Sequence, residues 1–571
     1  MTSLRLSCAV SLISFVFAAC SSGGSEEPSG EFLMVLQTAP QDGSDQAPTE
    51  ARIGFQVDGE IDPATLTSET FFVTAEDGTQ LEGERMILDD DPTAAEIVLD
   101  APMEVITNYT ATVTTGLQSL GGASLEEDYE WTFKTLDSEW GVSEWIEEDI
   151  NGTSRAHDAA VDGQSNALAV WVHETASGTA IWANRYNRTD LWGEPVAIDD
   201  GGGRVAEPKI AADEAGNGFA VWERINEGGV AANIWVNRYD VDTGAWGTAE
   251  LLQTGEVTRA EEPSIAAAPD GTAVATWAQV DPDLPGSRLV IWARVYAPGS
   301  GWGEAAQIGE TPQTSLIRAS QVGMDADGNA LAVWSRPAVG GDVIWSNRYT
   351  PGTGWGTPEL IKNDADPGAE PPREETTARQ FQLSVGAGGD AFVVWLQSAE
   401  GRNDVWAVRF SGSAWDTPER VDDYDDDSKT NPDIVVDGSG VAHAVWSQID
   451  PRFQNIWSNQ YTPGSGWGAP ELIEPPNDDP EEDANALEPS AGINAAGNAF
   501  VVWIQNTDSW ASIWSNRLDP GTGWIGAELI EAIDRPAKAP LVIVDDRRHA
   551  HALWLHFVDS GFDWVRTNRF E

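Results

Sequence analysis

The sequence has very little cysteine and little positive charge. Only two cysteines occur in 571 residues, Cys8 and Cys20, and both lie close to the N-terminus. We therefore expect a folded part without disulfides, stabilised by packing alone. Lysine and arginine together number 32 against 93 aspartates and glutamates, which gives a formal net charge of −61. This balance excludes nucleic acid as a partner, because binding to phosphates requires clustered lysine and arginine.

Long apolar stretches are also missing beyond the N-terminus. The first 19 residues have Arg5 near the start, an apolar run over 9–17, and small residues before Cys20, which is the pattern of an export signal. No later stretch reaches the roughly 18 apolar residues that a membrane-spanning helix needs. Any membrane attachment is therefore expected at the N-terminus.

Residues 17–20, Phe-Ala-Ala-Cys, resemble the lipobox of bacterial lipoproteins. The resemblance implies that 1–19 is a signal peptide, that Cys20 becomes a lipidated N-terminus, and that the protein is sorted to the outer membrane, facing the periplasm or the cell surface. Residues 20–30 are rich in Ser, Gly and Glu and are expected to form a flexible tether. An ordinary secretory signal with a chance cysteine is the alternative.

Residues 31–136 show short alternating segments, such as 53–57, separated by turn residues, which is typical of a small β-sandwich. The motifs Ile-Asp-Pro-Ala-Thr-Leu at 61–66, Asn-Tyr-Thr at 108–110 and Trp-Thr-Phe-Lys-Thr at 131–135 resemble the bacterial Ig-like domain first described in surface-layer proteins. The resemblance implies a spacer or interaction module without catalytic residues.

Residues 137–571 repeat one unit. An apolar run ending in tryptophan recurs about every 55 residues, a period that indicates a propeller or a solenoid. These tryptophans are Trp171, Trp222, Trp277, Trp334, Trp395, Trp446, Trp503 and Trp554. Each run is followed by a segment like Ile-Trp-Ala-Asn-Arg-Tyr at 181–186 and by a motif like Gly-Trp-Gly at 354–356. The almost wholly apolar runs predict strands buried on both faces.

We expect four strands in each unit. The last unit ends just after Asn568-Arg569-Phe570 and lacks a fourth strand, whereas 140–146, ahead of the first unit, matches the missing piece. The fold class is therefore predicted to be all-β: an Ig-like sandwich followed by an eight-bladed β-propeller, closed by pairing of 138–150 with the last blade. An open solenoid is the alternative.

The recurring polar and aromatic residues are candidates for either packing or binding. Regular tryptophans favour packing between blades, while sugar-binding pockets between blades, as in some lectin propellers, are the alternative; Trp510 stands outside the register in a loop. The candidate ligand-binding residues are Trp510, Trp182, Trp235, Trp345, Trp457 and Trp514. The recurring arginines (Arg185, Arg238, Arg348, Arg409, Arg517, Arg569) and asparagines (Asn184, Asn237, Asn347, Asn459, Asn516, Asn568) are expected to pair with neighbouring carboxylates or carbonyls.

Catalytic and metal motifs are not recognisable. The six histidines are scattered, and His551 falls at a position that is apolar in most units, which predicts a core histidine. The turns only partly match the Asp box of sialidases, and no catalytic residues of that family or Ser-His-Asp order can be identified. Acidic runs between units favour a solvated rim, with calcium as the one cofactor to consider. The calcium candidates are Asp422, Asp423, Asp425, Asp478 and Asp479.

These observations predict a lipid-anchored protein of the cell envelope whose propeller recognises a glycan or a protein without catalysis. Long, irregular loops on one face of a rigid scaffold are where binding sites tend to form. One alternative is a scaffold for envelope assembly. The other is a glycan-cleaving hydrolase, which would need two carboxylates facing one cleft.

Overall fold

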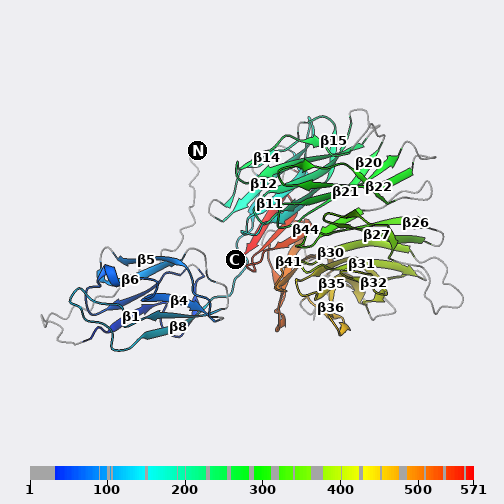
Figure 1. Ribbon diagram of the computed structural model, residues 1–571. Coiled ribbons are helices and arrows are strands. Elements are labelled where there is room, and N and C mark those ends of the chain that lie inside the picture. The colour runs from blue at the N-terminus through cyan, green and yellow to red at the C-terminus, as the bar shows by residue number, and fades with distance from the viewer. Residues whose placement is uncertain are drawn as a thin grey trace. The chain divides into compact units, whose positions relative to one another are not determined.

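The protein divides into two compact units, one ending at Asp137 and one beginning at Ser138 (Figure 1). The computed structural model describes residues 32–49, 51–76, 78–88, 91–99, 103, 107–147, 152–188, 191–199, 201–226, 232–253, 259–281, 288–309, 320–338, 341–361, 377–399, 402–422, 428–450, 453–474, 485–506, 510–531, 535–558 and 561–571. The predicted signal, tether and lipidated Cys20 lie outside these residues. Within the described ranges, no helix has the length and apolar character to cross a membrane.

The first unit is a β-sandwich of two four-stranded sheets, with strand orders β1-β3-β6-β5 and β2-β8-β7-β4. Its strands are β1 (Val35–Ala39), β2 (Ser44–Ala47), β3 (Ile53–Val57), β4 (Phe71–Ala75), β5 (Gly83–Leu88), β6 (Asp91–Leu99), β7 (Asn108–Val113) and β8 (Tyr129–Thr135), with a 3-10 turn at Pro63–Thr65. Phe55, Phe71 and Trp131 are buried in one core shared by both sheets. The predicted Ig-like sandwich is confirmed.

The second unit forms eight antiparallel sheets among its described residues, one for each repeat. The first strands are β10 (Thr153–Val161), β15 (Arg204–Ala212), β20 (Ala260–Ala267), β25 (Ser320–Met324), β30 (Thr377–Val385), β34 (Lys429–Val436), β39 (Ala486–Ile493) and β44 (Ala537–Val544). The second strands are β11 (Ala167–Thr175), β16 (Gly218–Ile225), β21 (Ala273–Asp281), β26 (Ala330–Ala338), β31 (Asp390–Ala399), β35 (Ala442–Asp450), β40 (Ala499–Asn506) and β45 (Ala550–Phe557). The third strands are β12 (Gly178–Asn187), β17 (Ala232–Asp240), β22 (Arg288–Ala297), β27 (Gly341–Thr350), β32 (Arg402–Ser411), β36 (Phe453–Thr462), β41 (Ala511–Asp519) and β46 (Asp563–Phe570).

The fourth-strand position is divided, which differs from the single strand expected in each unit. In most sheets two very short strands both pair with the third strand. They are β13 (Leu191–Trp192), β14 (Val196–Ala197), β18 (Ala245–Trp246), β19 (Glu250–Leu251), β23 (Gly301–Trp302), β24 (Ala306–Gly309), β28 (Gly354–Trp355), β29 (Glu359–Leu360), β37 (Gly466–Trp467), β38 (Glu471–Leu472), β42 (Gly523–Trp524) and β43 (Glu528–Leu529). In the fifth sheet, β33 (Glu419–Arg420) alone takes this position. Several repeats place a proline in the gap, such as Pro195 and Pro358, and proline cannot donate to the ladder.

The eight sheets close into a ring. First strands of consecutive sheets contact one another, and β44 of the last sheet contacts β10 of the first. The strand β9 (Glu144–Trp145) completes the last sheet by pairing with β46, which places Glu144 opposite Thr567. Trp140 forms a further bridge with Phe570. The predicted propeller fold and its closing pairing are therefore confirmed.

The core of the ring is built from the second strands. The tryptophan that ends each apolar run is only 0–1% exposed, as for Trp171 and Trp222. In the first seven sheets it lies directly opposite the tryptophan of the third strand, as Trp171 does with Trp182, whereas in the last sheet Trp554 lies opposite Arg566. A buried indole of this kind removes roughly 150–250 Å² from water, worth about 4–6 kcal/mol before conformational entropy is subtracted. Packing between sheets thus supplies the stability that disulfides do not.

The first strands carry a repeated bulge that adds one residue relative to the second strand. Non-glycine residues with positive φ stand at this point, namely Ala156, Glu207, Glu262, Gln380, Asn431, Glu488 and Ala539. Two residues further along, a polar side chain bonds to the next sheet. The backbone N–H of Ile210 donates to Asp158 at 3.0 Å, and that of Ala491 donates to Asp433 at 2.9 Å. The bulge thus directs the side chains that follow it toward the next sheet, where they accept hydrogen bonds from its backbone.

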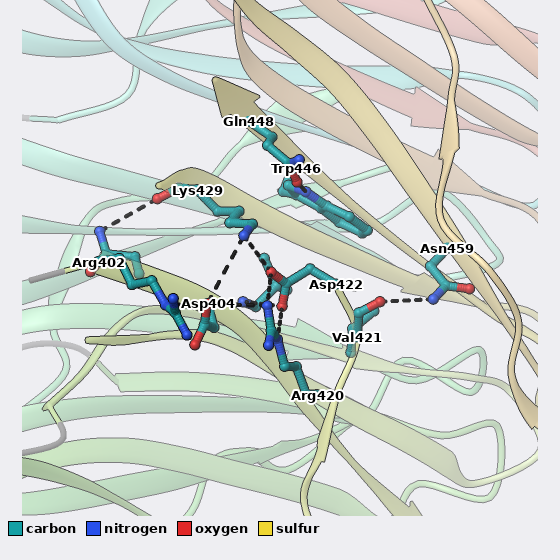
Figure 2. A network of polar contacts seen from close by, with 11 residues as sticks. Arg402, Asp404, Arg420, Val421, Asp422, Lys429, Trp446, Gln448 and Asn459 are labelled. Carbon is teal, nitrogen blue, oxygen red and sulfur yellow. Dashed lines mark hydrogen bonds and ion pairs between the residues drawn. The ribbon is translucent and has the colours of Figure 1, made fainter. Parts of the chain in front are cut away.

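A buried acidic residue stands where the chain leaves one sheet for the next. It occurs in five repeats as Glu147, Asp199, Asp422, Glu474 and Glu531. Figure 2 shows the example between the fifth and sixth sheets, where the fully buried Lys429 Nζ lies 2.7 Å from the Asp422 carboxylate and Arg420 Nε lies 2.9 Å from it. The Val405 N–H also donates to Asp422, at 3.1 Å.

The partner of this buried acid changes from repeat to repeat. Arg224 lies 3.4 Å from Asp199, and His556 lies 2.5 Å from Glu531. Glu474 instead forms no ion pair with any described residue, and burial raises its pKa to about 8 despite a hydrogen bond from the Ile456 N–H. The same position therefore lies beside a basic side chain in some links and is protonated at neutral pH in another.

Candidate functional site

A groove of about 550 Å³ lies between the first and second sheets, on the side of the ring formed by the outer strands. One wall comes from β12 at residues 183–185 and from the segment 193–199 that contains β14. The other wall comes from Tyr239 on β17 and from 244–249 around β18. The groove therefore exists only because two repeats pack side by side.

Three side chains form its frame. The Arg185 guanidinium carbon lies 5.6 Å from the centroid of the Tyr239 ring, within cation–π range. Tyr239 in turn packs edge-on against Trp246, with ring centroids 5.7 Å apart. The β17–β18 ladder places Tyr239 directly opposite Trp246. Because Trp246 is followed by Gly247, no side chain at that position covers the groove.

Polar groups converge on this frame. Within the part of the chain that the structure describes, the buried Arg185 Nε has no hydrogen-bond partner, and the nearest carboxylate, Asp162, is 3.9 Å from its Nη2. Glu194 is exposed and unpaired within the described residues, whereas Asp199 is held by Arg224. The floor is apolar and includes Val196, which is 44% exposed. The groove thus combines an aromatic and aliphatic surface with one available guanidinium and one available carboxylate.

An equivalent groove of about 270 Å³ lies between the fifth and sixth sheets. Arg409, Tyr461 and Trp467 occupy the same positions as Arg185, Tyr239 and Trp246, with the Arg409 guanidinium carbon 5.6 Å from the Tyr461 ring centroid. Tyr461 and Trp467 pack edge-on with centroids 5.6 Å apart. Arg409 is held more firmly, since its Nη2 donates to Asp390 at 2.5 Å. Glu419 and Asp416 are the exposed carboxylates of this groove, and Asp416 lies 4.0 Å from Arg409.

A third cavity, of about 410 Å³, is lined by the bulged first strands of the last four sheets. Apart from Ala539, its residues are polar or proline and include Gln380, Asn431 and Glu488. Burial raises the pKa of Asp433 in its wall to about 6, although two backbone N–H groups bind this carboxylate. No aromatic side chain lines this cavity, so it lacks a surface on which a sugar ring could stack.

Two carboxyl groups on neighbouring sheets have strongly shifted pKa values. Burial and repulsion from Glu207 and Glu261 raise the pKa of both Glu223 and Glu262 to about 7. Neither glutamate lines any of the three cavities. The pKa values of Glu223 and Glu262 are therefore raised because adjacent strands partly bury these groups and bring several glutamates close together, and not because the two groups belong to a cavity.

The candidate tryptophans of the sequence are placed away from the grooves. Trp182, Trp235, Trp345, Trp457 and Trp514 pack in or against hydrophobic clusters between sheets. Arg224 and Arg336 further cover Trp235 and Trp345, at 4.0 and 4.1 Å from the ring centroids. Trp510 is 46% exposed but lines none of the three cavities, so its role in binding stays a prediction.

The frame residues that matter, Trp246 and Trp467, belong to the Gly-Trp-Gly-like motif, which sequence reasoning assigned to packing. A small residue on each side of a recurring tryptophan is the signal that could have pointed to them. Such neighbours leave an indole partly uncovered, and both indoles are only half-buried.

The recurring arginines and asparagines connect neighbouring sheets. Arg238 lies over Tyr296 at 5.8 Å, and Arg569 over Tyr186 at 4.8 Å, in each case the ring of the following sheet. The asparagines reach the carbonyl at the end of the preceding sheet, as Asn237 does by donating to Ile198 at 2.8 Å. Sequence reasoning missed Arg294, which replaces the asparagine in the third sheet.

The acidic calcium candidates do not form a visible site. Asp422 is buried in the ion-pair network of Figure 2, with Lys429 and Arg420 as its partners. Asp423, Asp425, Asp478 and Asp479 lie outside the described residues. The described residues hold no group of three or more side chains suited to a metal ion. His551 is buried, as predicted, and burial lowers its pKa to about 4.

Comparison with known proteins identifies the first unit. Residues 32–135 match the family of bacterial Ig-like domains. This match confirms the resemblance derived from the motifs of that segment. No curated protein sequence matches the chain.

Similar solved structures include the Dos1 propeller, with 8% identity and a TM-score of 0.42 over 76% of this chain and 95% of that chain. The polysaccharide lyase Uly1 has 11% identity and a TM-score of 0.40 over 76% and 99% of the two chains. An α-L-arabinofuranosidase of Fusarium graminearum has 12% identity and a TM-score of 0.33 over 54% and 92%. These likenesses are too distant to support a statement about activity.

Proposed function

We propose that the propeller is a noncatalytic binding module that holds a glycan in the groove between its first and second sheets. The observation that carries the proposal is the frame of Arg185, Tyr239 and Trp246. Sugar rings offer an apolar face that stacks on an indole and hydroxyls that need nearby donors and acceptors. The groove supplies the indole of Trp246, the guanidinium of Arg185 and the carboxylate of Glu194 together.

The charge arrangement favours binding over cleavage. Glycoside hydrolysis commonly uses two carboxyl groups that flank the scissile bond. In the described groove, Asp199 is engaged by Arg224, which leaves Glu194 as the available carboxylate. The hydrolase alternative therefore has less support here than recognition.

The scaffold alternative would be supported by a broad apolar patch. Exposed leucines do recur on the outer strands, at Leu251, Leu360, Leu472 and Leu529, each 40–47% exposed. They belong to four different sheets, the second, fourth, sixth and seventh, with one such leucine in each. Scattered single apolar residues are ordinary on protein surfaces.

We further propose that this module stands in the cell envelope. The support is in the sequence, where the lipobox-like residues 17–20 would attach the chain to the outer membrane through Cys20. The serine- and glycine-rich stretch that follows would separate the folded units from the lipid surface. The ligand would then be a glycan of the envelope or of the cell's surroundings.

The test is a glycan array probed with residues 31–571 and with two variants. Trp246→Ala removes the indole of the groove, and we expect it to weaken binding about tenfold or more, in line with the loss of an aromatic contact worth about 1.4 kcal/mol. Trp355→Ala is the matched control, because Trp355 occupies the same position in the fourth sheet but packs against the same hydrophobic cluster as Val295, which stands where most repeats have arginine. Arrays that remain negative, or equal losses in both variants, would contradict the proposal.

A further inference from the structure

The groove between the fifth and sixth sheets has the same construction as the first groove. Arg409, Tyr461 and Trp467 meet with nearly the same ring separations as Arg185, Tyr239 and Trp246. Both frames come from a third strand of one sheet and the third and fourth strands of the next. A ligand that fits one frame therefore meets the same aromatic and guanidinium geometry in the other.

Between the second and third sheets, Arg238, Tyr296 and Trp302 keep the same arrangement, with Arg238 5.8 Å from the Tyr296 ring and the Tyr296 ring 5.5 Å from Trp302, but Arg238 also donates to Asp240 at 2.8 Å. At two other junctions the arrangement is occupied or altered. Between the fourth and fifth sheets, the Trp415 indole donates to Ser346 at 2.9 Å and Arg348 donates to the Gly412 carbonyl at 2.5 Å, so both polar groups are occupied. Between the sixth and seventh sheets, Gln460 and Leu518 stand where the frame needs arginine and tyrosine.

At the junction of the last and first sheets, which closes the ring, the arginine is also hydrogen-bonded within the protein. Arg569 donates to the Tyr186 hydroxyl at 2.5 Å and to Glu571 at 2.9 Å. The motif thus recurs in most repeats, and the two grooves described above are two places where its arginine, tyrosine and tryptophan line a cavity, of about 550 and 270 Å³.

The position of the two grooves in the ring separates them widely. One lies between the first and second sheets and the other between the fifth and sixth, which is four steps apart in a ring of eight sheets. They therefore lie on opposite sides of the ring. One short ligand cannot occupy both, whereas a polymer or a glycan-coated surface can engage both.

The walls indicate the class of sugar. The first groove has the exposed carboxylate of Glu194, and the second has those of Asp416 and Glu419. The chain as a whole carries a formal charge of −61. Uronate or sulfate groups would be repelled by both, so neutral sugars fit better.

We propose that the protein is a bivalent receptor for neutral glycans, with a second site at Arg409, Tyr461 and Trp467 opposite the first. This proposal rests on the function proposed above and extends it to a second site and a ligand class. Bivalent attachment increases apparent affinity for a polymer without any new contact, because the second binding event becomes intramolecular.

The experiment uses short linear oligosaccharides of glucose, galactose and mannose, together with the corresponding polymers fixed to a sensor surface. Native mass spectrometry counts the bound oligosaccharides, and surface binding gives the dissociation rate from the polymer. The proteins are residues 31–571 unchanged, Trp246→Ala, Trp467→Ala, the double variant, and Trp355→Ala as control.

We expect two oligosaccharides bound to the unchanged protein and to the control, one to each single variant, and none to the double variant. Dissociation from the polymer should become at least tenfold faster in each single variant. A stoichiometry of one, lost in Trp246→Ala and unaffected by Trp467→Ala, would overturn the second site while leaving the proposed function intact. Absence of binding to every neutral probe, with binding to acidic glycans on the array, would overturn the ligand class alone.

Discussion

At the scale of single residues, the links between sheets show how a strongly acidic protein uses its few cations. Lys429 is fully buried against Asp422, and the carboxylate of Asp404 lies 4.0 Å from its Nζ. Burial and the charge of Asp422 raise the pKa of Asp404, which shows how closely these carboxylates approach. The sequence could not reveal this network, because Asp422 appears there as part of an acidic run that is typical of a solvated loop.

Replacing Lys429 with methionine should destabilise the protein by about 3 kcal/mol, because it leaves a buried carboxylate without its main partner. The matched control is Lys538→Met, which removes an exposed lysine paired with Asp563 at 2.6 Å and should cost less than about 1 kcal/mol. Urea unfolding followed by tryptophan fluorescence measures both. Adding Asp422→Asn to Lys429→Met should recover part of the loss. Equal losses of unfolding free energy in the two lysine variants would show that the buried ion pair contributes no more to stability than the exposed one.

At the scale of elements, the repeated strands were predictable and the divided fourth strand was not. Apolar runs ending in Trp171 or Trp222 indicated strands buried on both faces, and those residues are indeed buried. The fourth-strand position depends on the turn after the Gly-Trp-Gly-like motif, where proline removes a ladder donor. The spacing of hydrophobic residues along the sequence does not indicate where a strand is divided in this way. The same motif contributes Trp246 to the groove, so the least predictable element also forms the candidate site.

The third sheet offers a direct test of how its sheet-to-sheet connection works. Arg294 donates to the Leu252 carbonyl at 2.9 Å and to the Gly303 carbonyl at 2.8 Å, which are the bonds that Asn237 makes to Ile198 and Gly247 one repeat earlier. Arg294→Asn should therefore change stability by less than about 1 kcal/mol, whereas Arg294→Ala should cost about 1–3 kcal/mol by leaving carbonyls unpaired. Thermal unfolding compares the two. A loss in the asparagine variant as large as in the alanine variant would contradict this equivalence.

At the scale of the whole molecule, the exposed positive charges of the ring lie where its strands come closest together. Among described residues of the second unit, the exposed basic side chains all lie on or beside first strands, namely Arg155, Arg204, Lys209, Arg259, Arg379 and Lys538. First strands converge on the centre of the ring, so carboxylates such as Glu207 and Glu262 approach one another most closely there. Cations at this place offset the repulsion that a net charge of −61 would otherwise concentrate.

The closure of the ring was predictable because the last repeat lacks a piece that precedes the first, and the match between Trp140-Gly141 and the Gly-Trp-Gly-like motif revealed it. The ligand site was less predictable, because a groove between repeats depends on side chains from two of them. Regular spacing shows that Arg185 and Trp246 recur but not that they meet. Both grooves nevertheless depend on the ring being closed, since an open array would let the sheets shift against one another.

Closure is tested most directly by an engineered disulfide between Glu144→Cys on β9 and Thr567→Cys on β46, in a chain with Cys8 and Cys20 changed to serine. These residues lie directly opposite each other, where side chains of paired strands are about 4.5–5.5 Å apart at Cβ. Val142→Cys with Thr567→Cys is the control outside the register, since Val142 is 92% exposed. We expect the first pair to oxidise completely within one chain and to raise the melting temperature reversibly with reductant. Free thiols or linked dimers in the folded protein would contradict the closed ring.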